Sequence, residues 1–493
     1  MKLFTIGDSI SQGFMSLAAA RSDLAFSTLI ARSLGLEPGS DAYPVPSWGA
    51  GGLPLNVEVL LRRLEAEVGC DIEGLVEILR SGSAIAGFVD AVEDYYERGE
   101  GSLARPQAGA TAFFPNVASA GLTVADAWKL TPGLCAGIIA RDGGGRTDSP
   151  FFGLPSRPTE RIAHAVLNPS RNPRFDGTSQ LDWLRAHVER EGVENLILWL
   201  GSNNILGTII RMRVHETPES GPSPLTMGYE ERSAFNFWRL EHFREEFAEL
   251  IARVDAILQG NPRPCRVFVA TIPPVTIAPL AKGIGGTVRV EDPFGVVTPS
   301  AVYFERYTYF PFDDDPDGVP DDLSLSLDDA LRIDRTIAAY NRAIRHLVEE
   351  RNRMDAGHAR YVVVDIAEHL LRLAYKRNGG RPTYRLPDGL RRHVDRTGKP
   401  VDTRYYHADR EGRLTAGGVF SLDGVHPGAI GHGLIAHEFL EVMRANGAEV
   451  VRELDWDAIV ASDSLWQEPI GLISEIYERD ELVELVIRAF GLR

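Results

Sequence analysis

In the stretch "TIGDSISQG", residues 5–13, a short apolar run is followed by Asp8, Ser9 and a turn that ends at Gly13. The run Lys2–Gly7 predicts a β-strand, and the polar turn predicts the start of a helix. Further strands are expected near Ala112–Asn116 and at Asn195–Leu200, Arg266–Thr271 and Arg360–Asp365. The last three runs do not alternate with polar residues, which is typical of strands buried on both faces of a parallel sheet.

Helical patterns lie between these runs. The segment Phe235–Leu258 spaces its apolar residues for one helical face, namely Leu240, Phe243, Phe247, Leu250, Ile251 and Val254. Ala330–Glu350 and Ala429–Ala445 show similar spacing. Alternating strands and helices predict an open, doubly wound α/β sheet.

The intervals between the predicted elements exceed what simple crossovers need. We therefore interpret residues 1–445 as one α/β domain with long insertions at about 36–110, 129–180, 205–232, 275–325 and 376–420. Residues 446–493 read as an acidic, amphipathic helical extension that packs on the domain or forms an interface.

Composition narrows the classes of function. The chain has 493 residues and a net charge of −17, which disfavours binding to nucleic acid or to an anionic membrane. Its three cysteines are widely spaced, which indicates neither a zinc site nor a disulfide framework. We find neither a secretory leader after Met1 nor an apolar run of about 18 residues, so we expect a cytoplasmic protein without a membrane span. The oligomeric state stays open.

Ligands of such sheets bind outside the carboxyl ends of the strands. Ser9 follows the first predicted strand, and a serine becomes a nucleophile when a base, itself oriented by a carboxylate, takes its proton. Asp423 and His426 are three residues apart and can supply that pair. The N–H groups of Ser9 and Gly121 and the side-chain amide of Asn203 can form a three-donor oxyanion hole.

Four sequence blocks resemble, in order, the signatures of the SGNH or GDSL hydrolases: "GDSI" (7–10), "NVASAGLTV" (116–124), "GSNN" (201–204) and "DGVHP" (423–427). Members of that family are esterases, lipases, thioesterases, carbohydrate deacetylases and some acyltransferases. The resemblance implies a flavodoxin-like, three-layer α/β/α fold with five parallel strands. It also implies Ser9 as nucleophile, His426 as base, Asp423 as its partner, and a small-molecule, lipid or sugar ester as substrate, without a cofactor.

The chain departs from the family pattern in two ways. The third block usually ends in aspartate, and here Asn204 stands in that place, so support from a neighbouring carboxylate is lost or replaced. The gaps between the blocks are also much longer than in small members of the family. These gaps bear on the substrate more than on the chemistry.

Each candidate residue also has a structural interpretation. Ser9 and Asn203 are both suited to capping a helix, and Gly121 can simply allow a turn. The combination of all the blocks favours catalysis over these separate explanations. We interpret His432 and His437 as structural because their spacing suits no metal-ligand set. An acyltransferase, a non-catalytic binding module and a phosphate-binding enzyme remain as alternative functions.

One acidic stretch, "DDDPDGVPDD" (313–322), begins like a calcium loop. Asp313, Asp315 and Asp317 alternate and a glycine follows, but the twelfth position is Ser324 instead of glutamate. A solvated acidic loop is the simpler interpretation. The aromatic run at 303–312, just before it, suits packing of an insertion onto the core or the lining of a pocket, and Trp48 suits a lid.

Overall fold

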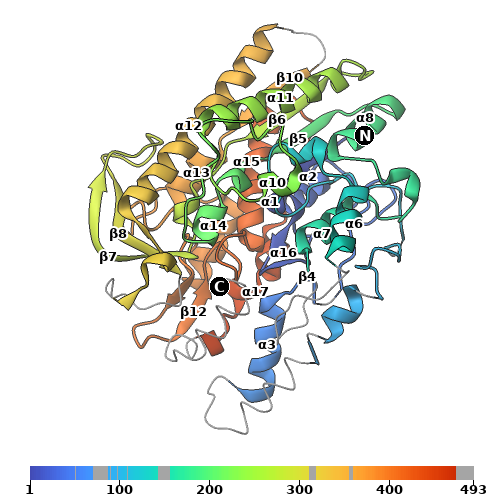
Figure 1. Ribbon diagram of the computed structural model, residues 1–493. Coiled ribbons are helices and arrows are strands. Elements are labelled where there is room, and N and C mark those ends of the chain that lie inside the picture. Colours follow the sequence, from blue (N-terminus) through green and yellow to red (C-terminus); the bar gives the residue numbers. More distant parts are fainter. Residues whose placement is uncertain are drawn as a thin grey trace.

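The computed structural model describes residues 1–473 except 50, 70–86, 89, 97, 108, 143–155, 310–317 and 355–358. Four strands form a parallel sheet, and they occur where the continuous apolar runs predict them (Figure 1). The strands are β1 (Phe4–Gly7), β5 (Asn195–Trp199), β6 (Cys265–Ala270) and β10 (Ala359–Val364), which lie in the order β1-β5-β6-β10. The chain is therefore a mixed α/β protein with a parallel sheet.

The predicted fifth strand is wrong as a regular element. The segment near Asn116 runs beside β1, but it pairs with it through a single parallel bridge from Thr5 to Asn116. Thr5 donates its N–H to the carbonyl of Pro115, and Val117 donates to the carbonyl of Thr5. Pro115 has no N–H of its own, which interrupts a regular ladder at this edge of the sheet.

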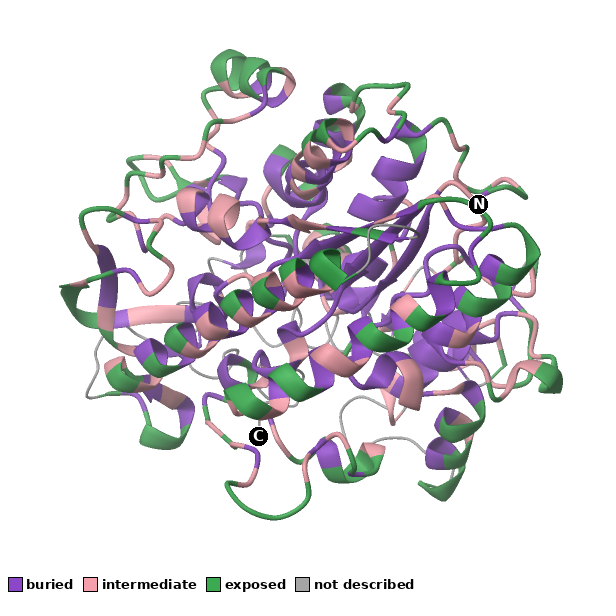
Figure 2. Ribbon diagram, turned by 90° about the horizontal axis from the view of Figure 1, so that it is seen from above, coloured by how far each residue is buried: buried purple, intermediate pink, exposed green. Residues whose placement is uncertain are grey.

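Helices cover both faces of the sheet, as Figure 2 shows with buried strands between helices whose outer faces are exposed. Side chains of β5 alternate between the two sides: Leu196 and Leu198 join one apolar cluster, and Ile197 and Trp199 join another. The first cluster contains residues of α8 (Gln180–Arg190), α11 (Leu240–Leu258) and α12 (Leu327–Met354). The second contains residues of α2 (Phe26–Ser33) and α15 (Ala429–Ala445).

The helix expected from Phe235 begins later, at Leu240. The preceding residues are held in other contacts, because Phe237 forms a parallel bridge with Glu216 and Trp238 donates its N–H to the carbonyl of Asn204. Phe243, Phe247 and the other predicted face residues of α11 are buried, except Leu240, which is exposed at the first turn.

The insertion at 275–325 contributes a small antiparallel sheet of β7 (Ala281–Val290), β8 (Ala301–Tyr309) and β9 (Ser324–Ser326). The aromatic run packs into the core at this place, because Tyr303, Tyr307 and Tyr309 of β8 are buried in the first cluster. The remaining elements of four or more residues are α1 (Ser9–Gln12), α3 (Val57–Val68), α5 (Asp126–Lys129), α6 (Pro132–Arg141), α7 (Pro158–Leu167), α9 (Gly207–Ile210), α10 (Tyr229–Arg232), α13 (Ile366–Leu373), α14 (Asp388–Thr397), β12 (Leu414–Gly417), α16 (Trp456–Ser462) and α17 (Ser464–Gln467). The shorter elements are β2 (Phe14–Met15), β3 (Ala18–Ala19), β4 (Leu53–Pro54), β11 (Tyr406–Ala408) and four 3-10 turns, η1 (Pro173–Phe175), η2 (Ser202–Asn204), η3 (Val275–Ile277) and η5 (Asp321–Leu323).

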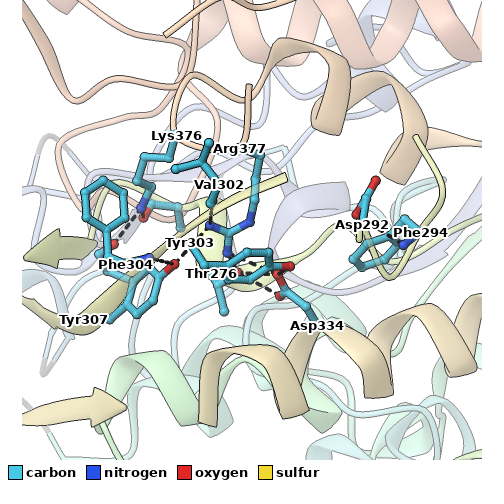
Figure 3. A network of polar contacts seen from close by, with 12 residues as sticks. Thr276, Asp292, Phe294, Val302, Tyr303, Phe304, Tyr307, Asp334, Lys376 and Arg377 are labelled. Carbon is cyan, nitrogen blue, oxygen red and sulfur yellow. Dashed lines mark hydrogen bonds and ion pairs between the residues drawn. The ribbon is translucent and has the colours of Figure 1, made fainter. Parts of the chain in front are cut away.

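A buried polar network fastens this insertion to the core (Figure 3). The Arg377 guanidinium lies 3.7 Å from the ring centroid of Tyr303 and 3.1 Å from a carboxylate oxygen of Asp334. Thr276 and Tyr303 both donate hydroxyl hydrogen bonds to the same carboxylate. The network thus joins β8, α12 and the turn η3.

The described part of the C-terminal extension packs on the domain. Trp466 is 1% exposed and donates its indole N–H to the carbonyl of Pro400 at 3.1 Å. Trp456 is also buried in the second cluster, beside α15. Residues 446–473 are therefore part of the folded unit.

Candidate active site

Ser9 is the first residue of α1, directly beyond β1. Asp8 is the N-cap, and its Oδ1 accepts the N–H of Ile10 at 3.2 Å. The turn is tight, because a Cβ on Gly7 would lie 2.3 Å from Oγ of Ser11. Ser9 is therefore the residue after the cap, and its hydroxyl is not used in capping this helix.

His426 connects Ser9 to Asp423. Its Nε2 lies 2.9 Å from Oγ of Ser9, and its Nδ1 lies 3.0 Å from Oδ2 of Asp423. When Nδ1–H donates to the carboxylate, Nε2 is the acceptor for the serine hydroxyl. The ring of Phe14 packs against the imidazole with the two centroids 4.7 Å apart.

Asp423 is held by three backbone N–H groups. Its Oδ1 accepts from Val425 and His426, and its Oδ2 accepts from Leu17 at 2.9 Å. Burial alone would raise the pKa of Asp423, but His426 and these N–H groups lower it below its ordinary value. The side chain is therefore a carboxylate at neutral pH, as the orientation of His426 requires. The contribution of Leu17 could not be predicted, because it comes from a backbone N–H that every residue type except proline carries.

Asp8 differs from Asp423 in its ionisation. Its carboxyl is buried, which raises its pKa to about 7, and the N–H of Ile10 and the nearby His426 only partly offset the cost of burial. The hydrogen bond to Ile10 indicates that Asp8 orders the turn that carries Ser9.

Gly121 and Asn203 lie together but line a different cavity from Ser9. Asn203 donates one amide hydrogen to the carbonyl of Leu122 at 2.9 Å, which orients the amide. An amide carries two such hydrogens, so the second can still be donated to a ligand. Gly121 has φ +79°, a backbone conformation that favours glycine. The chain just before it is tied to α1, since Ala120 donates its N–H to the side chain of Gln12.

Glu246 of α11 places a carboxyl group beside Asn204, the residue that follows the oxyanion candidate Asn203. Its Oε2 accepts from Nδ2 of Asn204 at 3.1 Å, and Oδ1 of Asn204 accepts the N–H of Val124. Burial raises the pKa of Glu246 to about 7. Glu246 lies on the buried face of α11, between Phe243 and Leu250. An acidic residue among the apolar positions of a helix face is visible in the sequence, but a search for apolar spacing alone does not select it.

An apolar cavity opens beside Ser9 and His426, and we call it the acyl-side cavity. It lies along the carboxyl ends of the strands, because Ser9, Ser202, Pro273 and Ile366 follow β1, β5, β6 and β10 and all line it. Its apolar walls include Val275, Ile277, Leu370, Leu373, Leu434 and Ile435. These residues carry no distinctive motif, so the sequence could not single them out.

A second cavity of about 340 Å³ is lined mainly by polar side chains, and we call it the polar cavity. Gly121 and Asn203 line it, together with the buried ion pair of Asp126 and Arg232. The segment from Ser202 to Ile210 contributes residues to both cavities. Ser202 and Leu206 line the acyl-side cavity, whereas Asn203, Gly207 and Ile210 line the polar cavity.

The sequence also pointed to a calcium loop and to two histidines of α15. The calcium candidates Asp313, Asp315 and Asp317 lie outside the described residues. Within the described ranges, no group of three or more His, Cys, Asp or Glu side chains is arranged to hold a metal ion. His432 is buried against Phe26, and burial lowers its pKa to about 3.

None of the helices in the described part of the chain is both long enough and apolar enough to cross a membrane. Comparison with family models, curated proteins and solved structures finds no match to the chain. The case for a function therefore depends on the residues and their geometry.

Proposed function

We propose that the chain is a serine-dependent carboxylic ester hydrolase of the SGNH type. The observation that carries this proposal is the hydrogen-bonded series Asp423, His426 and Ser9, with distances of 3.0 and 2.9 Å, at the edge of an apolar cavity. The order of the four sequence blocks supports it independently.

The reaction proceeds in two halves. Nε2 of His426 takes the hydroxyl proton while Oγ of Ser9 bonds to the ester carbon, and the carbonyl oxygen becomes an oxyanion. Donors from Ser9, Gly121 and Asn203 stabilise that charge. The bond from carbon to the alcohol oxygen then breaks, and His426 returns the proton to the departing alcohol.

Water completes the cycle. His426 takes a proton from water, whose oxygen attacks the acyl-enzyme carbon, and the bond to Oγ of Ser9 breaks as that oxygen regains a proton. The products are one carboxylic acid and one alcohol. Throughout, the Asp423 carboxylate stabilises the imidazolium form of His426.

The first test is hydrolysis of p-nitrophenyl esters from acetate to palmitate, with labelling by a fluorophosphonate probe. We expect Ser9→Ala to abolish labelling and to lower kcat by on the order of a thousandfold or more. Ser464→Ala is a matched control on an exposed serine far along the chain. Wild-type rates in Ser9→Ala, or equal labelling of both proteins, would contradict the proposal.

A further inference from the structure

The acyl-side cavity is lined by the nucleophile and also by three further polar side chains, His369, Tyr384 and Glu438. His426 lies just before α15, and Glu438 lies nine positions after Ala429, the first residue of that helix. At 1.5 Å per residue, this places Glu438 about 13 Å along the helix axis from the catalytic end. The cavity therefore extends well beyond the space that an acetyl group needs.

The three polar side chains, His369, Tyr384 and Glu438, form what we call the end cluster. Nε2 of His369 lies 3.0 Å from Oε2 of Glu438, and the hydroxyl of Tyr384 donates to Oε1. The Glu438 carboxylate raises the pKa of His369 above its ordinary value, although burial opposes this. Because these groups satisfy one another and are polar, the cluster ends the apolar lining of the cavity.

The volume of the cavity limits what it can hold. The space that the centre of a water molecule can reach is about 90 Å³. A site that only just holds one water leaves almost no space for the centre of that water to move, so this volume corresponds to room for several carbon atoms.

The two cavities differ in which half of an ester they suit. Asp126, Glu160 and Arg232 line the polar cavity, which therefore suits a polar alcohol and the incoming water. During turnover the alcohol leaves first, and the acyl group stays attached to Oγ of Ser9 until water arrives. The apolar space that continues from Ser9 suits the group that stays attached.

We propose that the acyl-side cavity binds an unbranched, apolar acyl chain that extends from Ser9 along α15, and that the end cluster limits its length. This inference rests on ester hydrolysis at Ser9 as the proposed function. It names medium-chain carboxylic esters as the substrate class, in place of acetyl or long-chain esters.

The test compares kcat/KM for p-nitrophenyl acetate, hexanoate, octanoate and palmitate. Ile435→Trp places a large ring in the cavity, and Glu441→Trp places the same ring on an exposed position of the same helix. We expect Ile435→Trp to lower kcat/KM for octanoate by about tenfold or more while acetate changes by less than about twofold. Glu441→Trp should leave the whole series unchanged.

A second pair of variants tests the end of the cavity. Tyr384→Ala removes the ring and should shift the preferred chain toward more carbons. Tyr384→Phe keeps the ring but loses the hydroxyl that contacts Glu438, so it should keep the wild-type preference. Thermal unfolding and labelling by a small ethyl fluorophosphonate show whether each variant keeps its fold and its active serine.

A binding measurement separates failure of this inference from failure of the proposed function. Calorimetric titration with octanoate needs no catalysis. We expect the wild-type protein to bind octanoate but not acetate. We expect Ile435→Trp to bind neither. Absence of octanoate binding, or equal loss of activity on all chain lengths in Ile435→Trp, would overturn the acyl pocket even if Ser9 is reactive. A protein that binds octanoate but hydrolyses no ester would keep the pocket and overturn the hydrolase.

Discussion

Asn203 is oriented by a hydrogen bond that uses only one of its two amide hydrogens. Leu122 accepts one amide hydrogen, so the amide is fixed before any ligand arrives. A donor that is already oriented costs little reorganisation when charge develops in a transition state. Asn203 was a candidate from the sequence. Its partner, the carbonyl of Leu122, could not be predicted, because every residue type has a backbone carbonyl.

We expect Asn203→Ala to lower kcat by about a hundredfold or more, with a smaller change in KM, because the donor acts mainly on the transition state. Asn203→Asp keeps the shape of the side chain but has no amide hydrogens, so it should lose a similar factor. Steady-state kinetics on a hexanoate ester would check both. Full activity of the aspartate variant would exclude a donor role.

Glu246 is a single residue that makes the free energy of unfolding depend on pH. Burial raises the pKa of its carboxyl from 4.5 to about 7, so the folded protein keeps this proton over a range in which the unfolded chain has released it. The free energy of unfolding therefore falls as pH rises from 4.5 to about 7. A shift of this size corresponds to about 3 kcal/mol.

The variant Glu246→Gln should remove this cost, because glutamine is neutral and its amide oxygen can still accept from Asn204. We expect Glu246→Gln to gain stability relative to wild type at pH 8 and to match it more closely at pH 5. Urea unfolding at the two pH values measures the difference. Glu245→Gln, on the exposed side of α11, should show no comparable dependence on pH.

At the scale of elements, α15 begins without a capping side chain of its own. Its N-cap is Gly428, and Asp463 from the C-terminal extension accepts the N–H of Ile430 at 2.8 Å instead. The boundaries of α15 were predicted correctly from its apolar spacing. The cap was not, because it lies 33 positions further along the chain and depends on how the extension folds back.

Loss of this cap should affect both stability and the catalytic loop, since His426 lies just before α15. We expect Asp463→Ala to cost about 1–2 kcal/mol in the free energy of unfolding and to lower kcat. Asp455→Ala is the control for loss of a helix cap, because Asp455 caps α16, whereas Asp463 accepts the N–H of Trp466 in α17 as well as that of Ile430. Its loss of stability should be smaller, because Asp455 accepts one backbone N–H and Asp463 accepts two, while its kcat should stay at the wild-type value.

At the scale of the whole molecule, insertions that interrupt the sheet are fastened to it by buried polar groups. Arg377 and Asp334 are both fully buried, and the network around them also holds Thr276 of η3. Val275 and Ile277 of that turn line the acyl-side cavity. The sequence predicted the sheet from its apolar runs, but this network joins charges distant in the chain and could not be predicted from local pattern.

A charge left unpaired in the interior is costly, whereas removal of both partners often is not. We therefore expect Arg377→Met to destabilise the protein by about 3–5 kcal/mol. The double variant Arg377→Met with Asp334→Leu should recover part of that loss. Chemical unfolding of the two single variants and the double variant gives the coupling, and additive losses would show that the two charges act independently.

The separation between Ser9 and His426 has a consequence for protein synthesis. The two side chains meet across 417 positions of the chain. A nascent chain on the ribosome therefore carries its serine for 417 further positions until the histidine is added. A stop codon between positions 9 and 426 yields a product with a nucleophile and no base, so translation through His426 sets the earliest moment at which the chain can become reactive.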